Sequence, residues 1–268
     1  MLPFLPMPAI DADQDAQAAV LLAAIGPAVV VLSPHSDDAP YSIAGVMRAL
    51  ARRGVRVEML TLFSRSAYAP GRPGLDEADV TALRRAEDEA AGTAIDPQVQ
   101  VLWLDHRDVA LRHSLPVEAV VSRRPLDTDA TELVHGLAGE LAALCAAGET
   151  VLAPLGMGWH IDHRIAAAAG AALLRRGRCV HFYEDLPYAG FTRSSRLWLA
   201  QARRLWALRV PMRPLDVRTH ALMDLKQTVF AIYDSQASPA FWSALRRQTA
   251  RRGNAERLWL TRMRSARR

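Results

Sequence analysis

Two short clusters of histidine and aspartate, about 125 residues apart, carry the side chains best suited to chemistry. They are His35, Asp37 and Asp38 in SPHSDDAP (33–40), and His160, Asp162 and His163 in GMGWHIDH (156–163). Two imidazoles and a carboxylate, with a fourth position left to water, form the ligand pattern of a catalytic zinc site. His35, Asp38 and His163 would supply that set, and imidazole with carboxylate also suits iron or nickel.

The other residues of the two clusters could act on a substrate held beside the metal. Asp37 adjoins a ligand and could take the proton of a metal-activated water. His160 lies three residues before His163, so both side chains share a face on a first helical turn. His160 could then stabilise an oxyanion or protonate a leaving amine, with Asp162 keeping that imidazole charged or oriented. Such a site would hydrolyse an amide or an ester.

Neither cluster is specific by itself. Two histidines at this spacing are usually ordinary, and paired aspartates after a strand often cap a helix. Their joint occurrence, each just after a predicted strand, favours the metal site. The remaining histidines lack matched partners and we interpret them as structural: His106, His113, His135, His181 and His220.

The segments that must position these clusters alternate between strand and helix. Apolar, β-branched runs predict strands at 28–33, 55–64, 99–104, 150–156 and 179–188, and helical patterns lie at 42–54, 77–94, 130–148 and 161–177. This order predicts right-handed βαβ units in a Rossmann-like three-layer α/β sandwich with a mostly parallel sheet. Both clusters follow strands, at the edge where such sheets bind ligands. The first strand does not lead into G-x-G-x-x-G, so the dinucleotide fingerprint is missing.

Length and composition suit one globular domain spanning 1–268. It would have an α/β core at 28–188 and a helical, arginine-rich C-terminal extension over the core at 189–268. Cys145 and Cys179 are far apart, which argues against a disulfide framework and favours the cytoplasm. The apolar start at 1–10 lacks a basic flank and does not read as a signal peptide. No apolar run is long enough to predict a transmembrane segment.

Basic charge is concentrated late in the chain. Residues 193–268 hold 17 Arg and Lys but only 4 Asp and Glu, which could meet an anionic substrate, an acidic partner or a membrane surface. A general preference of the chain for arginine explains this basic charge more simply, because the chain has a single lysine among its 33 basic residues. Arg65 and Arg72, after the second predicted strand, could reach the crevice and bind a phosphate-bearing substrate. We expect no nucleic-acid partner, since charge alone supports only nonspecific contact and no recognition motif is present.

At these residues the chain resembles a known family. PHSDDA (34–39) resembles the HPDDE motif, and HIDH (160–163) the HPDH motif, of the PIG-L/LmbE-like zinc-dependent N-deacetylases. The likeness runs from about residue 28 to 260 through RRAEDEAA, LWLDHRD, FYEDLPYA, KQTVFAIYDSQ and AERLW. The resemblance implies a Rossmann-like fold and removal of an N-acetyl group from a glucosamine-containing conjugate. It implies the same roles as above for His35, Asp37, Asp38, His160, Asp162 and His163.

The chain departs from the family motif at three places. Ser36 replaces the proline, Ala39 replaces the glutamate, and the glycine pair reads AG at 44–45. Loss of the glutamate would remove a partner of the site, and such partners are worth about ten-fold or more in metal affinity or rate. Ser36 would loosen a turn that proline stiffens. The ligands and the base are kept, so we expect activity.

The leading hypothesis is a cytoplasmic deacetylase that uses Zn²⁺, or another divalent metal such as Fe²⁺. Its substrate would be a small-molecule N-acetylated amino-sugar conjugate, possible classes being lipids, glycosides, nucleotide sugars and antibiotic intermediates. The alternatives are a metal-dependent amidase for a non-sugar amide and a binding protein of the same fold without turnover. Four late residues could belong to the site, to a subunit contact or, in our interpretation, to a packed corner: Lys226, Tyr233, Ser235 and Gln236.

Overall fold

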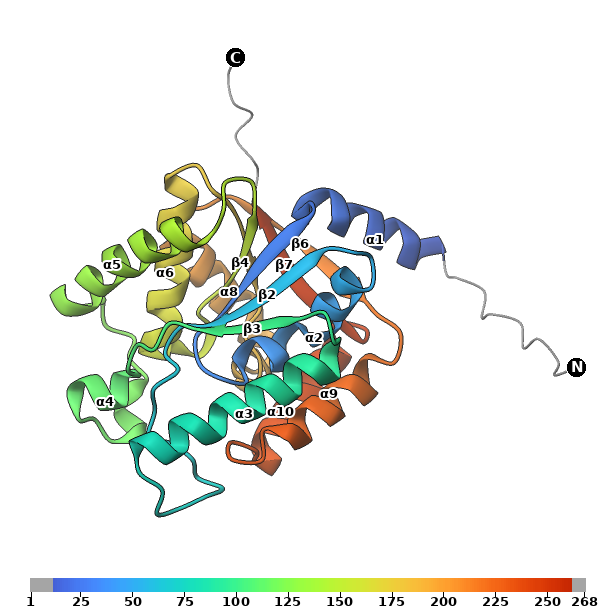
Figure 1. Cartoon of the computed structure of the whole chain (residues 1–268). Coiled ribbons are helices and arrows are strands. Elements are labelled where there is room, and N and C mark those ends of the chain that lie inside the picture. The colour runs from blue at the N-terminus through green and yellow to red at the C-terminus, as the bar shows by residue number, and fades with distance from the viewer. Residues whose placement is uncertain (1–11, 262–268) are drawn as a thin grey trace, which may run out of the picture.

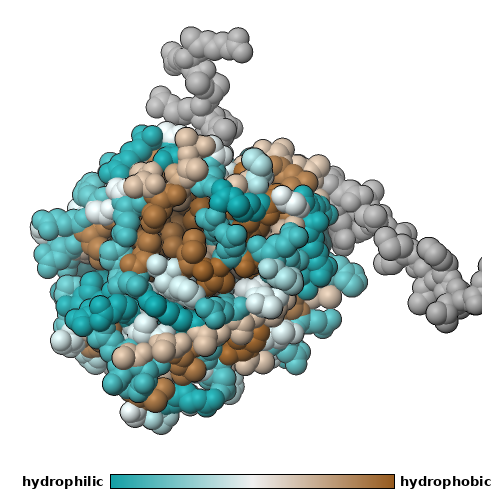
Figure 2. Space-filling model, viewed as in Figure 1, coloured by the Kyte–Doolittle hydropathy of each residue, from teal (hydrophilic) through white to brown (hydrophobic). Residues whose placement is uncertain are grey.

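The computed structural model describes residues 12–261 of the chain. The prediction that the apolar start is not a signal peptide concerns residues 1–10, which lie outside this range. No helix within the described range is long and apolar enough to span a bilayer. On the face seen in Figure 2, apolar residues gather where the strands show between the helices, and hydrophilic residues surround them.

A seven-stranded sheet with the order β3-β2-β1-β4-β5-β7-β6 forms the centre of the molecule (Figure 1). Its strands are β1 (Ala28–Ser33), β2 (Arg56–Thr61), β3 (Gln100–Trp103), β4 (Thr150–Pro154), β5 (Cys179–Tyr183), β6 (Met212–Arg218) and β7 (Ala255–Thr261). The first five strands are parallel, and β7 pairs antiparallel with both β5 and β6. The predicted mostly parallel α/β sheet is confirmed.

Helices cover both faces of this sheet (Figure 1). They are α1 (Ala12–Ile25), α2 (Asp38–Ala51), α3 (Glu77–Ile95), α4 (Val109–His113), α5 (Thr128–Leu144), α6 (Ile161–Arg175), α7 (Tyr188–Phe191), α8 (Ser194–Leu208), α9 (Leu222–Ile232) and α10 (Pro239–Arg251). Helix α2 packs on α3 and α9, while α5 packs on α6, which lies against β4 and β5. Two 3₁₀ turns, Val117–Val120 and Met157–Trp159, complete the elements.

Local sequence explains where these elements form and how closely they pack. All six residues of β1, AVVVLS, are buried, as expected of a parallel strand covered on both faces. Asp76 and Asp127 are the N-caps of α3 and α5, and their carboxylates accept hydrogen bonds from main-chain N–H groups of the first turn. Gly170 lets α6 approach the sheet, because a Cβ there would lie 2.7 Å from the Cβ of Ala153.

Strands β1 and β4 are neighbours whose onward connections diverge. Strand β1 leads through α2 to β2 on one side, whereas β4 leads through α6 to β5 on the other. Such a switch point opens a crevice beyond the carboxyl ends of the two strands. Because the first histidine–aspartate cluster follows β1 and the second follows β4, the topology brings them together.

The C-terminal region contains the predicted helices together with two strands that were not predicted. Residues 189–261 contain helices but also β6 and β7, which extend the sheet. Strand β7 inserts between β5 and β6, and its Glu256 accepts hydrogen bonds from the main-chain N–H groups of Gly45 and Val46 in α2. Strand β6 carries Pro214, which an edge strand tolerates because one row of its N–H groups has no partner. The predicted helices are therefore present in this region, and the two strands are an addition that the sequence analysis did not predict.

Candidate active site

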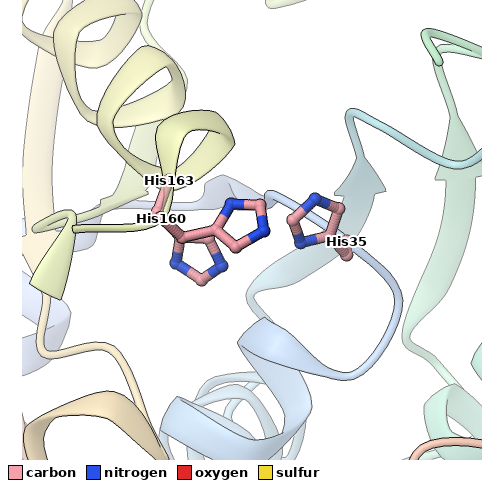
Figure 3. Close-up of side chains that lie close together, drawn as sticks. All are labelled: His35, His160 and His163. Carbon is pink, nitrogen blue, oxygen red and sulfur yellow. The ribbon is translucent and has the colours of Figure 1, made fainter. Parts of the chain in front are cut away.

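Three imidazoles meet at the crevice (Figure 3). His35 comes from the loop after β1, and His160 and His163 come from the start of α6. One ring nitrogen of each lies within 4.8 Å of the corresponding nitrogens of the other two. Residues 125 positions apart in the chain therefore share one site because their strands are neighbours.

Asp38 completes a convergent donor set with two of these rings. Its Oδ2 lies 3.2 Å from Nδ1 of His35 and 3.0 Å from Nε2 of His163. Nε2 of His163 is buried and makes no hydrogen bond with any described residue. A buried nitrogen without a hydrogen-bond partner, facing a carboxylate oxygen, fits the position of a metal ligand. Two imidazoles and one carboxylate are also a donor set that suits Zn²⁺.

A second layer of carboxylates holds the far side of both rings. Nε2 of His35 lies 2.9 Å from Oδ2 of Asp162, and Nδ1 of His163 lies 2.8 Å from Oδ1 of Asp185. The other oxygen of Asp185 accepts hydrogen bonds from the N–H groups of Gly156 and Met157 in the loop after β4. Metal-binding histidines commonly donate their second ring N–H to a carboxylate in this way.

The sequence analysis expected Asp162 to support His160, but the side chain of Asp162 makes no hydrogen bond with His160. Its carboxylate contacts the ring of His35, and it also accepts hydrogen bonds from Arg112 at 2.6 Å and from the N–H of Val109 at 2.8 Å. Only its main-chain N–H reaches Nδ1 of His160, at 3.2 Å. The reason is local: His160 is the N-cap of α6 rather than a residue of its first turn.

The capping hydrogen bond also determines where the ring proton of neutral His160 lies. Because Nδ1 accepts from the main chain, the proton is on Nε2. Burial and the neighbouring rings of His35 and His163 lower the pKa of His160 well below its ordinary value. A neutral ring with a proton on Nε2 is a hydrogen-bond donor for an oxyanion, and this geometry favours that role over proton delivery.

Asp37 is held in an uncommon backbone conformation, with φ at +90°, immediately before α2. A non-glycine residue in this region stores strain, and such strain clusters at functional sites. Its carboxylate is buried and lies 3.6 Å from the guanidinium of Arg84, which donates a 2.7 Å hydrogen bond to the carbonyl of Ser36. Burial and the adjacent Asp38 raise the pKa of Asp37 well above its ordinary value.

The imidazoles of His35 and His163, each of which lies between two carboxylates, have raised pKa values. Burial opposes their positive charge, but the adjacent carboxylates outweigh it and raise the pKa of His35 to about 9 and that of His163 to about 10. For Asp38, burial acts in the opposite direction to His163 and His35, which together bring its pKa well below the usual range. This strong field of paired charges marks the crevice as the functional centre.

The departures from the family motif have local compensations. Ser36, in place of proline, donates a 3.0 Å hydrogen bond to the buried Asp88 of α3. Ala39, in place of glutamate, is buried and its N–H donates to the hydroxyl of Ser33 at 3.0 Å. Asp162 and Asp185 supply carboxylates to the rings of His35 and His163.

Sequence reasoning missed three residues of this site: Arg84, Arg112 and Asp185. Asp185 carried a usable signal, because it follows the fifth strand in FYEDLP and so lies at the same sheet edge as the two clusters. The two arginines lie on helices and gave no comparable signal.

A cavity of about 210 Å³ opens beside the clusters. It is lined by His35, Asp37, Asp38, Ser66, Tyr68, Arg84, Asp108, Val109, Ala110, Val120, Val121, His160, Pro187, Tyr188, Gln236 and Phe241. Pockets for drug-sized ligands measure roughly 300–1,000 Å³. A cavity of this size accommodates a compact group and leaves the rest of a larger conjugate outside.

The structure places Arg65 and Arg72 away from this cavity. Arg65 lies 2.6 Å from a carboxylate oxygen of Glu77, and Arg72 lies 2.5 Å from one of Asp234. Neither arginine lines the cavity. The expectation that they reach the crevice is therefore corrected, because both guanidinium groups are paired on the outer surface.

The four late residues divide between packing and the cavity wall. Lys226 is buried, donates to the carbonyl of Tyr41 at 2.6 Å and pairs with Glu256 at 2.7 Å. Tyr233 and Ser235 donate to the carboxylates of Asp88 and Glu87 on α3. Gln236 alone among the four lines the cavity.

Comparison with known proteins indicates the same family as the two sequence motifs. Residues 30–174 match the PIG-L family, described as GlcNAc-PI de-N-acetylase. The chain belongs to this family. It is 34% identical to 2'-N-acetylparomamine deacetylase of Streptomyces fradiae over 170 residues, which are 60% of this chain and 57% of that protein. The chain thus matches just over half the length of that curated relative.

Solved structures share the fold over most of the chain. The zinc-inhibited form of teicoplanin deacetylase Orf2 superposes with a TM-score of 0.65 at 22% identity, over 89% of this chain and 99% of that one. N,N'-diacetylchitobiose deacetylase of Pyrococcus horikoshii has a TM-score of 0.55 at 18% identity, covering 96% and 94% of the two chains. The α/β architecture therefore has counterparts in solved proteins over most of the chain.

Proposed function

We propose that this protein is a metal-dependent N-deacetylase that hydrolyses the acetamide of an amino-sugar conjugate. The observation that carries this proposal is the convergence of His35, Asp38 and His163, with a separate carboxylate behind each ring. Membership of the PIG-L family and the likeness to 2'-N-acetylparomamine deacetylase support the reaction class. The small cavity beside the donor set supports a substrate that inserts one compact group.

His35, Asp38 and His163 would hold the ion, with Zn²⁺ as our proposed metal and Fe²⁺ as the alternative. When bound, the metal supplies an acidified water and a Lewis acid for the acetyl carbonyl. Asp37 receives the proton of the attacking water, and its position on the cavity wall allows it to pass that proton to the leaving nitrogen. His160 donates its Nε2 proton in a hydrogen bond to the developing oxyanion.

We further propose that residues 28–261 act as one catalytic domain, because β6 and β7 belong to the same sheet as the core strands. Cys145 and Cys179 are both free thiols. This supports a reducing compartment, and we place the enzyme in the cytoplasm.

The test is acetate release from a panel of N-acetylglucosamine conjugates by zinc-loaded protein. Asp37→Asn removes the proposed base, and we expect a loss of about 10²–10⁴-fold in kcat with zinc still bound. Asp224→Asn, on the exposed surface of α9, is the matched control and keeps wild-type activity. Equal acetate release by wild type and Asp37→Asn would show that another group takes the proton.

The same panel separates the alternatives. N-Acetylated amines without a sugar ring, included at equal concentration, would be the better substrates if the protein were a general amidase. Absence of turnover by fully zinc-loaded protein on every member would instead favour a binding protein of the same fold.

A further inference from the structure

A second hollow, of about 640 Å³, lies next to the catalytic cavity, and Tyr188 lines both. Five arginines line it: Arg123, Arg193, Arg196, Arg203 and Arg204. No acidic residue is among its lining residues in the described part of the chain. We call this hollow the arginine groove. Its wall also includes Trp159, which directly precedes His160, so one loop serves both the groove and the proposed oxyanion donor.

Several arginines elsewhere in the molecule have a carboxylate partner, and the arginines of this groove have none among the described residues. Arg65, Arg85, Arg112 and Arg257 each pair with a carboxylate. None of the five groove arginines lies within 4.0 Å of a carboxylate oxygen in residues 12–261. The groove therefore gathers five positive charges with no direct carboxylate partner in the part of the chain that the structure describes.

Arg204 gives the groove a built cationic centre. Only 5% of its surface is exposed, and its Nε donates a 3.1 Å hydrogen bond to the carbonyl of Leu155. The guanidinium lies 5.8 Å from the ring centre of Trp159, and its two terminal nitrogens donate to no described residue. The nearby carboxylate of Asp185 attracts this buried cation but forms no ion pair with it. Its terminal nitrogens therefore remain incompletely bonded, which is costly for a buried charge.

The loop after β4 is shaped around this guanidinium. Gly156 has φ at +78°, and a Cβ there would lie 2.5 Å from a terminal nitrogen of Arg204. Burial lowers the pKa of Arg204 to about 10, so the group is still charged at neutral pH. The absence of a side chain at Gly156 therefore leaves space at the floor of the groove for the charged guanidinium of Arg204, whose hydrogen bonds are incomplete.

We propose, on the basis of the deacetylase function above, that the arginine groove binds an anionic group, phosphate or carboxylate, on the part of the conjugate outside the catalytic cavity. Guanidinium forks match the oxygens of both groups, and incompletely bonded donors in a partly buried hollow bind them most strongly. The catalytic cavity holds only a compact group, so the remainder of a larger substrate must lie on an adjoining surface. The same field disfavours conjugates whose remaining part is cationic.

The experiment compares zinc-loaded wild type with the double variant Arg196→Gln/Arg203→Gln. The substrates are N-acetylglucosamine 1-phosphate and UDP-N-acetylglucosamine as anionic probes, with methyl and 2-aminoethyl N-acetylglucosaminides as neutral and cationic probes. Arg196 and Arg203 are exposed, so the fold tolerates their replacement. Arg175→Gln/Arg176→Gln, at the exposed end of α6, makes the same change in charge at a remote site.

We expect the ratio of kcat/KM for the better anionic probe to that for the methyl glycoside to fall by about ten-fold or more in the double variant. The remote control keeps the wild-type ratio. An unchanged ratio in the double variant, or an equal fall in the remote control, would overturn the proposal.

A binding measurement keeps this proposal separate from the deacetylase function. Calorimetry with glucosamine 1-phosphate and methyl glucosaminide needs no turnover. In one outcome, wild type deacetylates nothing but binds glucosamine 1-phosphate more tightly than methyl glucosaminide, and the double variant loses that preference. This would support the groove proposal and contradict the deacetylase proposal. If wild type deacetylates the methyl glycoside but shows no phosphate preference in rate or binding, the groove proposal falls alone.

Discussion

At the residue scale, His35 and His163 are each held between two carboxylates. Asp38 lies on the inner side of both rings, while Asp162 and Asp185 hold the outer nitrogens. Outer carboxylates fix the ring orientation and make the inner nitrogen a better ligand. The proposed metal site therefore depends on residues that do not touch the ion.

Replacing Asp185 tests this dependence. In Asp185→Asn, an amide that keeps its oxygen toward Gly156 and Met157 presents an N–H to Nδ1 of His163. The ring must then carry its proton on Nε2, the nitrogen that would bind the metal. We expect zinc affinity to fall about 10–100-fold in a competition titration against a chelating dye. Asp224→Asn should match wild type, and so would Asp185→Asn if the carboxylate were only a packing residue.

The proposed ligands and base were identifiable from the sequence because two histidine–aspartate clusters each follow a predicted strand. Asp185 could have been predicted in the same way, because it also follows a strand, β5. Arg84, which contacts Asp37 across the crevice, was not, because its role arises from the packing of α3 on α2. Arg65 and Arg72 were misplaced because position in a loop after a strand does not tell which carboxylate lies nearby.

At the element scale, α3 anchors the loop after β1 through the buried Asp88. Its carboxylate accepts hydrogen bonds from Ser36, from Thr61 of β2, from Trp103 of β3 and from Tyr233. All four donors are neutral, and burial raises the pKa of Asp88 above its ordinary value. The folded state thus holds this proton to a higher pH than the unfolded chain does.

A stability measurement against pH follows from that shift. Between about pH 4 and the raised pKa of Asp88, the folded state binds more protons, so its free energy of unfolding falls as pH rises. Asp88→Asn carries no such proton. We expect the free energy of unfolding of wild type, minus that of Asp88→Asn, to decrease with rising pH in urea titrations. A difference that increases with pH would show that the hydrogen bonds favour the carboxylate instead. Asp224→Asn, on the surface of α9, is the control.

Prediction of elements succeeded where the strands were continuous apolar runs and failed late in the chain. Each of the five parallel strands contains mainly apolar residues and lies within a predicted segment. Strands β6 and β7 were missed because arginine, proline and buried polar residues such as Glu256 obscure their pattern. Their strand character depends on partners that are distant in sequence.

At the scale of the whole molecule, metal binding should stabilise the fold, because the donors come from loops after different strands. At about 100 times its dissociation constant, Zn²⁺ would add ~2.7 kcal/mol to the free energy of unfolding. For a chain of this size that is a rise of roughly 5–10 °C in Tm. Differential scanning calorimetry should show the rise in wild type and lose it in His163→Ala. The same rise in both proteins would assign the zinc effect to another site.

The insertion of β7 between β5 and β6 has a consequence during synthesis. All of the proposed ligands leave the ribosome before Glu256, whose carboxylate accepts hydrogen bonds from the N–H groups of Gly45 and Val46 and pairs with Lys226. Until that strand arrives, the sheet has a gap and α2, which carries Asp38, lacks its support. We therefore expect the proposed metal site to be fully arranged only after this last strand has entered the sheet.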